Sequence, residues 1–257
     1  MLRVRVIPVL LLDQGGLVKT IGFKNKIYIG DVVNAIKIFN DKEVDEIVVL
    51  DISASKSKSE PNYQIIKDIA SECFMPLSYG GGINSLSQMS KIFSIGVEKI
   101  VLNQSLLNNR SFISKAIDLY GSQSIVASVD IKTNFFGKYK VYDYIKKKAV
   151  YLPVEKYIQH IENIGVGEIL VNNVSLDGTR LGPDMQIIKK IDQETTLPIV
   201  YCGGVGSFQH IVKMVKAGIR SIGVGSYFIL YGRHKAVLIN YLTSEKINVL
   251  NAIKVNS

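Results

Sequence analysis

Two glycine pairs stand at the ends of apolar segments and have the composition and spacing of an oxyanion site. Gly81–Gly82 lies in the motif YGGGI, and Gly203–Gly204 lies in YCGGVGS. Because glycine has no side chain, the backbone N–H groups of such a turn can approach a phosphate closely. Asn103 and Ser226, which follow two other apolar segments, add side-chain donors. One pair alone would indicate only a tight turn, whereas two equivalent pairs predict two phosphate sites and a ligand with a phosphate at each end.

The elements that must position these residues alternate between strand and helix along the whole chain. Amphipathic segments such as NYQIIKDIASEC and SFQHIVKMVKAG separate eight apolar, β-branched runs of strand length. The runs lie at residues 4–11, 46–52, 76–81, 99–104, 124–132, 168–174, 198–204 and 221–226. Eight strand–helix units in 257 residues predict an α/β fold of the (β/α)8 TIM-barrel type. In that fold the glycine pairs follow strands three and seven, at the C-terminal face, where active sites lie.

An internal repeat supports the same architecture. A shift of 122 residues places residues 60–85 over residues 182–207 without a gap, and it superposes the QIIK tetrads and the glycine pairs. Neither half can cover the open edge of its own sheet, so the two halves are expected to close on each other. The sequence therefore predicts a single barrel domain over 1–257, with half-barrels at about 1–122 and 123–246 and a C-terminal tail at 247–257.

Composition narrows the class of partner. The formal net charge of +9 favours anionic partners, and it is spread along the chain, with Lys146–Lys148 the only dense run. We therefore expect a phosphorylated small molecule rather than nucleic acid or a membrane. Two distant cysteines and three histidines without ligand spacing predict no disulfide, no metal and no cofactor, and they fit a reducing cytoplasm. Neither a signal peptide nor an apolar stretch long enough to span a bilayer is evident.

Six motifs spread over essentially the whole chain resemble those of one family. VIPVL, DEIVVLDISAS, YGGGI, VASVDIK, GEILVNNVSLDGT and YCGGVGS resemble the cyclase subunit of imidazole glycerol phosphate synthase, HisF. The LDISAS segment favours HisF over the sister isomerase of the histidine pathway. The resemblance implies a lyase-type synthase subunit of a glutamine amidotransferase. It would receive ammonia from a separate HisH-like glutaminase, pass it through the centre of the barrel and add it to a nucleotide with two phosphates.

The resemblance also assigns binding residues. Combined with the glycine pairs, it places the phosphate contacts at Gly81, Gly82, Asn103, Asp177, Gly178, Gly203, Gly204, Gly225 and Ser226. A mobile first loop would carry Lys19 as a catalytic residue. An ion ring gating the ammonia entrance at the barrel floor would comprise Arg5, Glu46, Lys99 and Glu168. Glu98, beside that ring, matches an acidic residue used in docking the glutaminase. From the residues alone, the four charged side chains could equally be a stabilising ion cluster.

The acid–base pair implied by the family is incomplete. Chemistry in HisF enzymes uses two aspartates, at the ends of strands one and five, and two carboxyl groups in different environments can hold different protonation states. Asp130 supplies the carboxyl group of strand five, but Leu11 occupies the matching position on strand one. Asp13 lies two residues further and would face the same way if the strand continued, so it is a possible substitute. Ser175 likewise stands where the family has an acidic residue.

These departures favour a HisF-like paralog that retains ammonia delivery and phosphate binding and has lost cyclisation. Such paralogs resemble HisF-type proteins of bacterial surface-polysaccharide pathways, including lipopolysaccharide biosynthesis. There, ammonia from the HisH-like partner allows a separate sugar amidotransferase to convert an acetamido group into an acetamidino group. Two alternatives stay open, a genuine cyclase subunit of histidine biosynthesis and a stand-alone phosphosugar-binding barrel.

Overall fold

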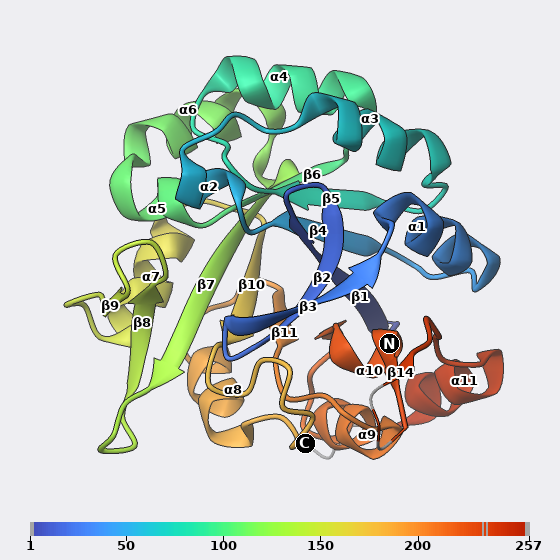
Figure 1. Ribbon diagram of the computed structural model, residues 1–257. Helices are drawn as coiled ribbons and strands as arrows, with labels where there is room; N and C mark the ends of the chain where they lie inside the picture. Colours follow the sequence, from blue (N-terminus) through green and yellow to red (C-terminus); the bar gives the residue numbers. More distant parts are fainter. Residues whose placement is uncertain (1–2, 233, 235, 255–257) are drawn as a thin grey trace.

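The eight predicted strands pair side by side in one closed parallel barrel (Figure 1), in a computed structural model that describes residues 3–232, 234 and 236–254. The barrel strands are β1 (Arg5–Asp13), β4 (Ile47–Asp51), β5 (Leu77–Gly80), β6 (Lys99–Leu102), β7 (Ile125–Thr133), β10 (Glu168–Asn173), β11 (Ile199–Cys202) and β12 (Ser221–Val224). Pairing of β1 with β12 and of β6 with β7 joins the two halves, so the sheet has no free edge within the barrel. The predicted (β/α)8 barrel is confirmed.

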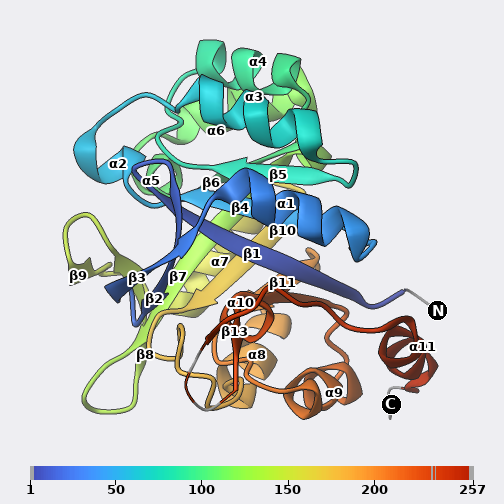
Figure 2. The ribbon, with the colours of Figure 1, turned by 45° about the vertical axis from the view of Figure 1, so that its right-hand side comes forward.

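One long helix follows each barrel strand and packs on the outside of the sheet (Figure 2). These helices are α1 (Val32–Asp41), α3 (Tyr63–Glu72), α4 (Leu86–Ile95), α6 (Arg110–Tyr120), α7 (Val154–Ile164), α8 (Met185–Asp192), α9 (Phe208–Lys216) and α11 (Ser244–Ala252). Polar side chains fix many of their starts. Ser85 and Gln88 form a capping box at α4, and Ser207 accepts a hydrogen bond from the backbone of His210 at α9.

Additional elements recur at equivalent places in the two halves. The hairpin β2 (Gly16–Ile21) and β3 (Lys24–Gly30) follows β1, and the hairpin β8 (Tyr139–Asp143) and β9 (Lys148–Ala149) follows β7. Short helices α5 (Gln104–Asn108) and α10 (Ser226–Ile229) follow β6 and β12. The remaining short elements are α2 (Ala54–Ser57), the 3-10 helix η1 (Ser122–Ser124), β13 (Leu230–Tyr231) and β14 (Ala236–Val237). The recurrence agrees with a duplicated half-barrel.

Two expectations about local structure were wrong. The segment expected to be a mobile first loop is the β2–β3 hairpin, and Lys19 is buried on β2. Its two turns have positive φ at both central residues, Gln14 and Gly15 in one and Gly22 and Phe23 in the other, which suits the right-handed twist of paired strands. The expected C-terminal tail begins inside helix α11, whose first turn is capped by Thr243.

Strand alternation separates two apolar regions. Successive side chains of a strand point to opposite faces of the sheet. Those on the outer face, such as Leu10 and Ile47, pack against the helices in the larger core cluster. Those on the inner face fill the barrel with an aliphatic layer, formed by Ile7, Val9, Val48, Val101, Val126, Leu170 and Val200. On β1 this inward series reads Arg5, Ile7, Val9 and Leu11, so the strand period places a charged residue at the floor and Leu11 at the mouth.

Candidate functional site

The four charged residues expected at the barrel floor form a closed ion ring. Arg5 contacts Glu46 at 2.9 Å and also contacts Glu168. Lys99 contacts Glu46 at 2.9 Å and Glu168 at 3.0 Å, so each carboxylate bridges both cations. Burial by itself would lower the pKa of Lys99, but the charges and hydrogen bonds of Glu168 and Glu46 outweigh it, and the net effect is a raised pKa. Lys99 therefore keeps its charge at neutral pH.

Ser221 and Ser78 complete this ring. The Ser221 hydroxyl accepts hydrogen bonds from the Arg5 guanidinium at 3.1 and 2.7 Å, and Ser78 donates to Glu46 at 3.4 Å. Glu98 directly precedes Lys99, and its side chain is exposed on the same face. The structure thus brings together all four ring residues and leaves Glu98 free at their side, within the part of the chain that it describes.

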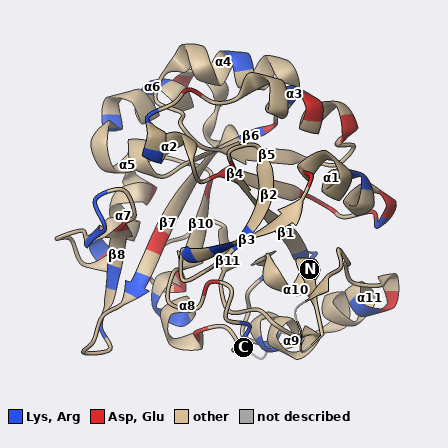
Figure 3. Cartoon of the chain, viewed as in Figure 1, with Lys and Arg blue, Asp and Glu red and all other residues tan. Residues whose placement is uncertain are grey.

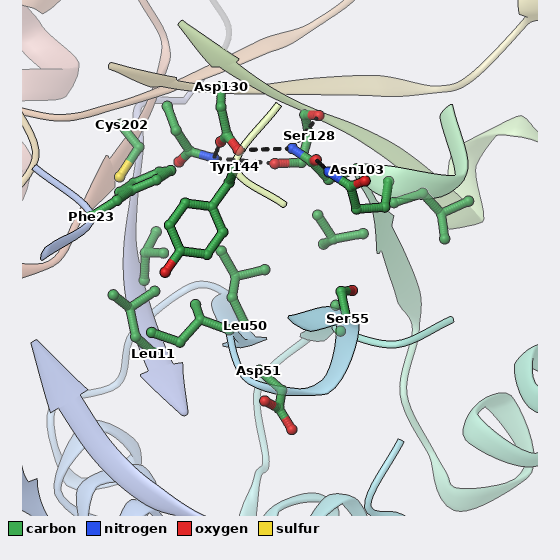
Figure 4. Close-up of a pocket in the computed structure, with 18 of the residues that line it drawn as sticks. Leu11, Phe23, Leu50, Asp51, Ser55, Asn103, Ser128, Asp130, Tyr144 and Cys202 are labelled. Atoms are coloured by element: carbon green, nitrogen blue, oxygen red, sulfur yellow. Dashed lines mark hydrogen bonds between the residues drawn. The ribbon is translucent and has the colours of Figure 1, made fainter. Parts of the chain in front are cut away.

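At the opposite end of the barrel a pocket opens at the C-terminal ends of the strands (Figure 4). Of the predicted site residues, it brings together Leu11, Lys19, Gly81, Gly82, Asn103, Asp130, Asp177 and Gly225. Gly178, Gly203, Gly204 and Ser226 do not line it. The hairpins after β1 and β7 meet at its rim, where the rings of Phe23 and Tyr144 contact edge to face at 5.7 Å between centroids.

Asp130 is the buried carboxyl group of this pocket. Its two oxygens accept hydrogen bonds from the side-chain amides of Asn103 and Asn172, both at 3.1 Å (Figure 4). Burial raises the pKa of Asp130 to about 7, and the two amide hydrogen bonds only partly offset that rise. A carboxyl group with such a pKa exchanges a proton near neutrality, which suits a general acid or base.

Apolar side chains face Asp130 across the pocket. Figure 4 shows Leu11 and Leu50 on the far side of the cavity, and Leu11 pairs in register with Leu50 of β4. Leu11 is 8% exposed, so its side chain forms part of the pocket wall. An aliphatic group can neither donate nor accept a proton, and the position opposite Asp130 supplies no acid–base function.

Two further carboxylates line the pocket but are engaged in holding loops. Asp51 accepts hydrogen bonds from Ser53 N at 2.8 Å, Ser53 Oγ at 2.7 Å and Ala54 N at 3.1 Å, which fixes the start of α2. Asp177 accepts from Lys19 at 3.1 Å and from Thr20 at 2.5 Å, joining the loop after β10 to β2. Since an ionised carboxylate only accepts hydrogen bonds, Asp177 could contact a phosphate only through its backbone N–H.

Asp13 does not reach the pocket. The chain turns at Gln14, and the Asp13 carboxylate forms an ion pair with Lys26 of β3 at 2.5 Å. It lines a separate hollow beside α2, together with Lys56 and Glu60. The suggestion that Asp13 replaces the missing acid is therefore wrong for this conformation, because a two-residue turn redirects the chain where the strand would have to continue.

The glycine pairs adopt the same backbone in both halves. Gly81 and Gly82 have φ values of 140° and 70°, and Gly203 and Gly204 have 124° and 83°. A Cβ on Gly82 would lie 2.8 Å from the Ser59 carbonyl oxygen, and one on Gly204 would collide with that of Gly182. These turns thus require glycine for packing as well as for any ligand.

The turn after β12 contains a buried hydroxyl group without a hydrogen-bond partner among the described residues. Ser226 is 5% exposed, and its Oγ has no hydrogen-bond partner among the described residues. Gly225, which precedes it, lies against the Lys19 ammonium group. A buried donor without a partner is costly, and an anion bound at this turn would supply the missing acceptor for Ser226.

Three pocket residues were missed at the level of sequence. Asn172 and Ser128 bond to each other at 3.1 Å and extend the Asp130 network, and Cys202 lines the same wall. The strand period could have found them, since Ser128 lies two residues before Asp130 and Asn172 lies four residues after Glu168 of the floor ring. Burial raises the pKa of Cys202 to about 12, so its thiol stays protonated and is a poor nucleophile.

Neither a metal site nor a membrane-spanning helix is present among the described residues. No three His, Cys, Asp or Glu side chains gather in a way that could hold a metal ion. None of the helices in the described ranges is both long and apolar enough to cross a bilayer.

Comparison with known proteins agrees with the geometry. The family model described as histidine biosynthesis protein matches residues 5–235. "Putative imidazole glycerol phosphate synthase subunit HisF" of Leptospira borgpetersenii is 46% identical over 94% of this chain and 96% of the relative. A protein of Pseudomonas aeruginosa named "Putative imidazole glycerol phosphate synthase subunit hisF2" is 42% identical over 97% and 100%. "Imidazole glycerol phosphate synthase subunit HisF" of Methanococcus vannielii is 33% identical over 85% and 88%. The chain belongs to the HisF family.

Proposed function

We propose that this chain is the synthase-type subunit of an ammonia-channelling glutamine amidotransferase that delivers ammonia to chemistry performed by another protein. The observation that carries the proposal is an aliphatic side chain, Leu11, opposite the Asp130 carboxyl group. Asp130 faces Leu11, and the neighbouring carboxylates of Asp51 and Asp177 already hold loops. Cyclisation by the HisF route needs a second proton-transfer group, and the pocket offers none at that position.

The interior of the barrel supports the transport step. Ammonia is small and neutral, whereas ammonium is charged and would be excluded by the aliphatic layer between floor and pocket. The ion ring stands at the start of that layer, and exposed Glu98 beside it supports a HisH-like glutaminase as the partner on this face. The ion ring would have to open for ammonia to enter the barrel. Breaking one of its four ion pairs could open it.

The acceptor chemistry of the proposal is amidination. Ammonia released at the mouth would be used by a sugar amidotransferase that turns an acetamido group into an acetamidino group in surface-polysaccharide biosynthesis. The pocket would bind a phosphorylated ligand through Lys19 and the backbone of Gly81 and Gly82, which line it. The unpaired hydroxyl of Ser226, which directly follows the pocket residue Gly225, supports a second anionic contact beside it.

The first experiment tests whether the chain has cyclase activity of its own. The purified protein is given the bisphosphate nucleotide of the histidine pathway with an ammonium salt in excess, so that no glutaminase is needed. A thermal-shift measurement with the same nucleotide establishes that the sample is folded and binds. We expect binding without turnover. Turnover would favour the alternative, a genuine cyclase subunit in which Asp130 suffices with another proton donor.

A second experiment tests delivery. The chain, its glutaminase and the sugar amidotransferase encoded in the same gene cluster are mixed with glutamine labelled with heavy nitrogen in its amide, in a large excess of unlabelled ammonium. Channelling predicts that the acetamidino product keeps the label, whereas free diffusion would dilute it. A product without label, or no product, would contradict the proposal.

A further inference from the structure

One segment of the pocket rim concentrates the positive charge of the protein. Residues 132–151, here called the lysine hairpin, span the end of β7, β8 and β9. They contain Lys132, Lys138, Lys140, Lys146, Lys147 and Lys148 against the single acid Asp143. The net charge of this segment is 6 − 1 = +5, out of +9 for the whole chain. More than half of the net charge thus lies around the run Lys146–Lys148, the one dense run noted in the sequence, and Figure 3 shows lysines gathered around β8 and β9.

The same segment exposes large aromatic side chains. Phe135 is 98% exposed and Phe136 is 81% exposed, and their rings contact only edge to face at 5.8 Å between centroids. Tyr151, at the other end of the segment, is fully exposed. Exposed aromatic groups rimmed by polar residues mark interaction surfaces, and aromatic residues dominate the energetics of interfaces.

Hydrogen bonds hold the aromatic tip in a defined conformation. The side chain of Asn134 accepts from the backbone N–H of Phe136 at 3.0 Å and of Lys138 at 2.8 Å. The backbone N–H of Asn134 donates to the Lys138 carbonyl at 2.9 Å. This turn directs both phenylalanines into solvent, so a partner would meet a preformed surface and lose little conformational entropy in ordering it.

The lysine hairpin is continuous with the pocket. Tyr144 and Ile145, in the turn between β8 and β9, line the pocket, and Lys146–Lys148 follow them directly. Asp143 accepts hydrogen bonds from the Lys146 backbone at 2.9 Å and from Gln104 of α5 at 3.2 Å, which anchors the turn to the barrel. A protein seated on the lysine hairpin would therefore lie against the mouth of the pocket.

We propose that the lysine hairpin is the docking surface of the protein that receives the ammonia, and that this protein presents an acidic surface around an apolar patch. The inference rests on the proposed function. Six lysines with one acid require an anionic partner, and the aromatic groups require an apolar one. The exposed groups extend from the hairpin tip to the pocket rim, which fits a broad protein surface better than the insertion of a single tip into a lipid bilayer.

The experiment uses the three-protein mixture with heavy-nitrogen glutamine, and the purified sugar amidotransferase of the same gene cluster is the probe. Two variants alter the lysine hairpin, Lys147→Glu/Lys148→Glu and Phe135→Ser/Phe136→Ser. The double variant Lys213→Glu/Lys216→Glu makes the same charge change on exposed positions of α9 and serves as a matched control. Melting temperatures establish that all variants are folded.

We expect each hairpin variant to lower labelled amidination by more than about tenfold, since replacing the few residues that dominate an interface costs that much or more. The control should match the wild type. Glutaminase activity should stay unchanged, and so should the rate of amidination when ammonium salt replaces glutamine. Neither reaction depends on the contact between the lysine hairpin and the sugar amidotransferase. Direct binding of the probe should weaken with salt, as expected for a contact made by lysines.

Other outcomes overturn the inference in distinguishable ways. Labelled product with the wild type and equally with both hairpin variants would refute the docking surface and leave the proposed function intact. If the wild-type protein yields no labelled product, the proposed function is refuted, and so is the docking inference that rests on it. If the variants retain transfer but lose sedimentation with vesicles of phosphatidylcholine and phosphatidylglycerol, the surface is a membrane anchor instead.

Discussion

Replacement of Asp130 by asparagine should stabilise the protein, and increasingly so as the pH rises. The pKa of Asp130 is raised from its ordinary 3.8 to about 7, because burial disfavours the carboxylate. Between these values the folded protein holds a proton that the unfolded chain has released, so the contribution of Asp130 to stability falls as the pH rises and levels off above about pH 7. The difference of about three pH units corresponds to about 4 kcal/mol.

The variant Asp130→Asn removes this dependence. Asparagine stays neutral, and its carbonyl oxygen can still accept from Asn103 or Asn172, although its amide cannot satisfy both as the carboxylate does. Relative to the wild type, the free energy of unfolding of the variant should rise by about 3 kcal/mol between pH 5 and pH 8. The absolute difference at one pH is less informative, because it includes the lost hydrogen bond.

Urea unfolding at a series of pH values measures this directly. Asp118→Asn, at an exposed position on α6, is the matched control and should follow the wild-type pH profile. A parallel titration of the Asp130 carboxyl by NMR should give a midpoint near neutrality. If the difference between Asp130→Asn and the wild type is flat from pH 5 to pH 8, then Asp130 is ionised at its ordinary pKa, and its assignment as a group that exchanges protons near neutral pH is wrong.

Three further perturbations test the other parts of the barrel. Lys99→Met leaves Glu46 and Glu168 with one cation and should lower the free energy of unfolding, measured by chemical denaturation, by about 3 kcal/mol. Adding Glu168→Gln should restore part of that loss. A change below about 0.5 kcal/mol would refute a stabilising ring. Leu11→Asp should raise ammonium-dependent turnover of the histidine-pathway nucleotide from the wild-type background to a measurable rate. If the wild-type protein already turns the nucleotide over and Leu11→Asp does not increase the rate, the cyclase alternative is favoured. Gly204→Ala should lower the free energy of unfolding by about 1–3 kcal/mol, because φ is +83° and the added methyl group meets the Gly182 carbonyl; an unchanged melting curve would contradict the packing argument.

The pattern of apolar and amphipathic segments was sufficient to predict the barrel fold. Apolar runs of strand length, alternating with amphipathic segments, predicted all eight barrel strands, because each strand is buried on both faces and must therefore be apolar throughout. Alternation of side chains along each strand could also have predicted which residues face the barrel interior. Asn172 was missed although it continues the inward series Glu168–Leu170–Asn172 on β10.

Residue type and spacing alone were enough to predict the fold class, the recurrence of the glycine turns and the lack of a carboxylate at Leu11. The rest of the site depends on contacts between segments that are distant in sequence. The tertiary structure turned the chain at Gln14 and paired Asp13 with Lys26, it tied Asp177 to Lys19, and it placed the amides of Asn103 and Asn172 against Asp130. Hydrogen bonding and burial depend on groups that are distant in sequence and meet only in the closed barrel, so neither the proton affinity of Asp130 nor the engagement of its neighbours could be deduced from the sequence.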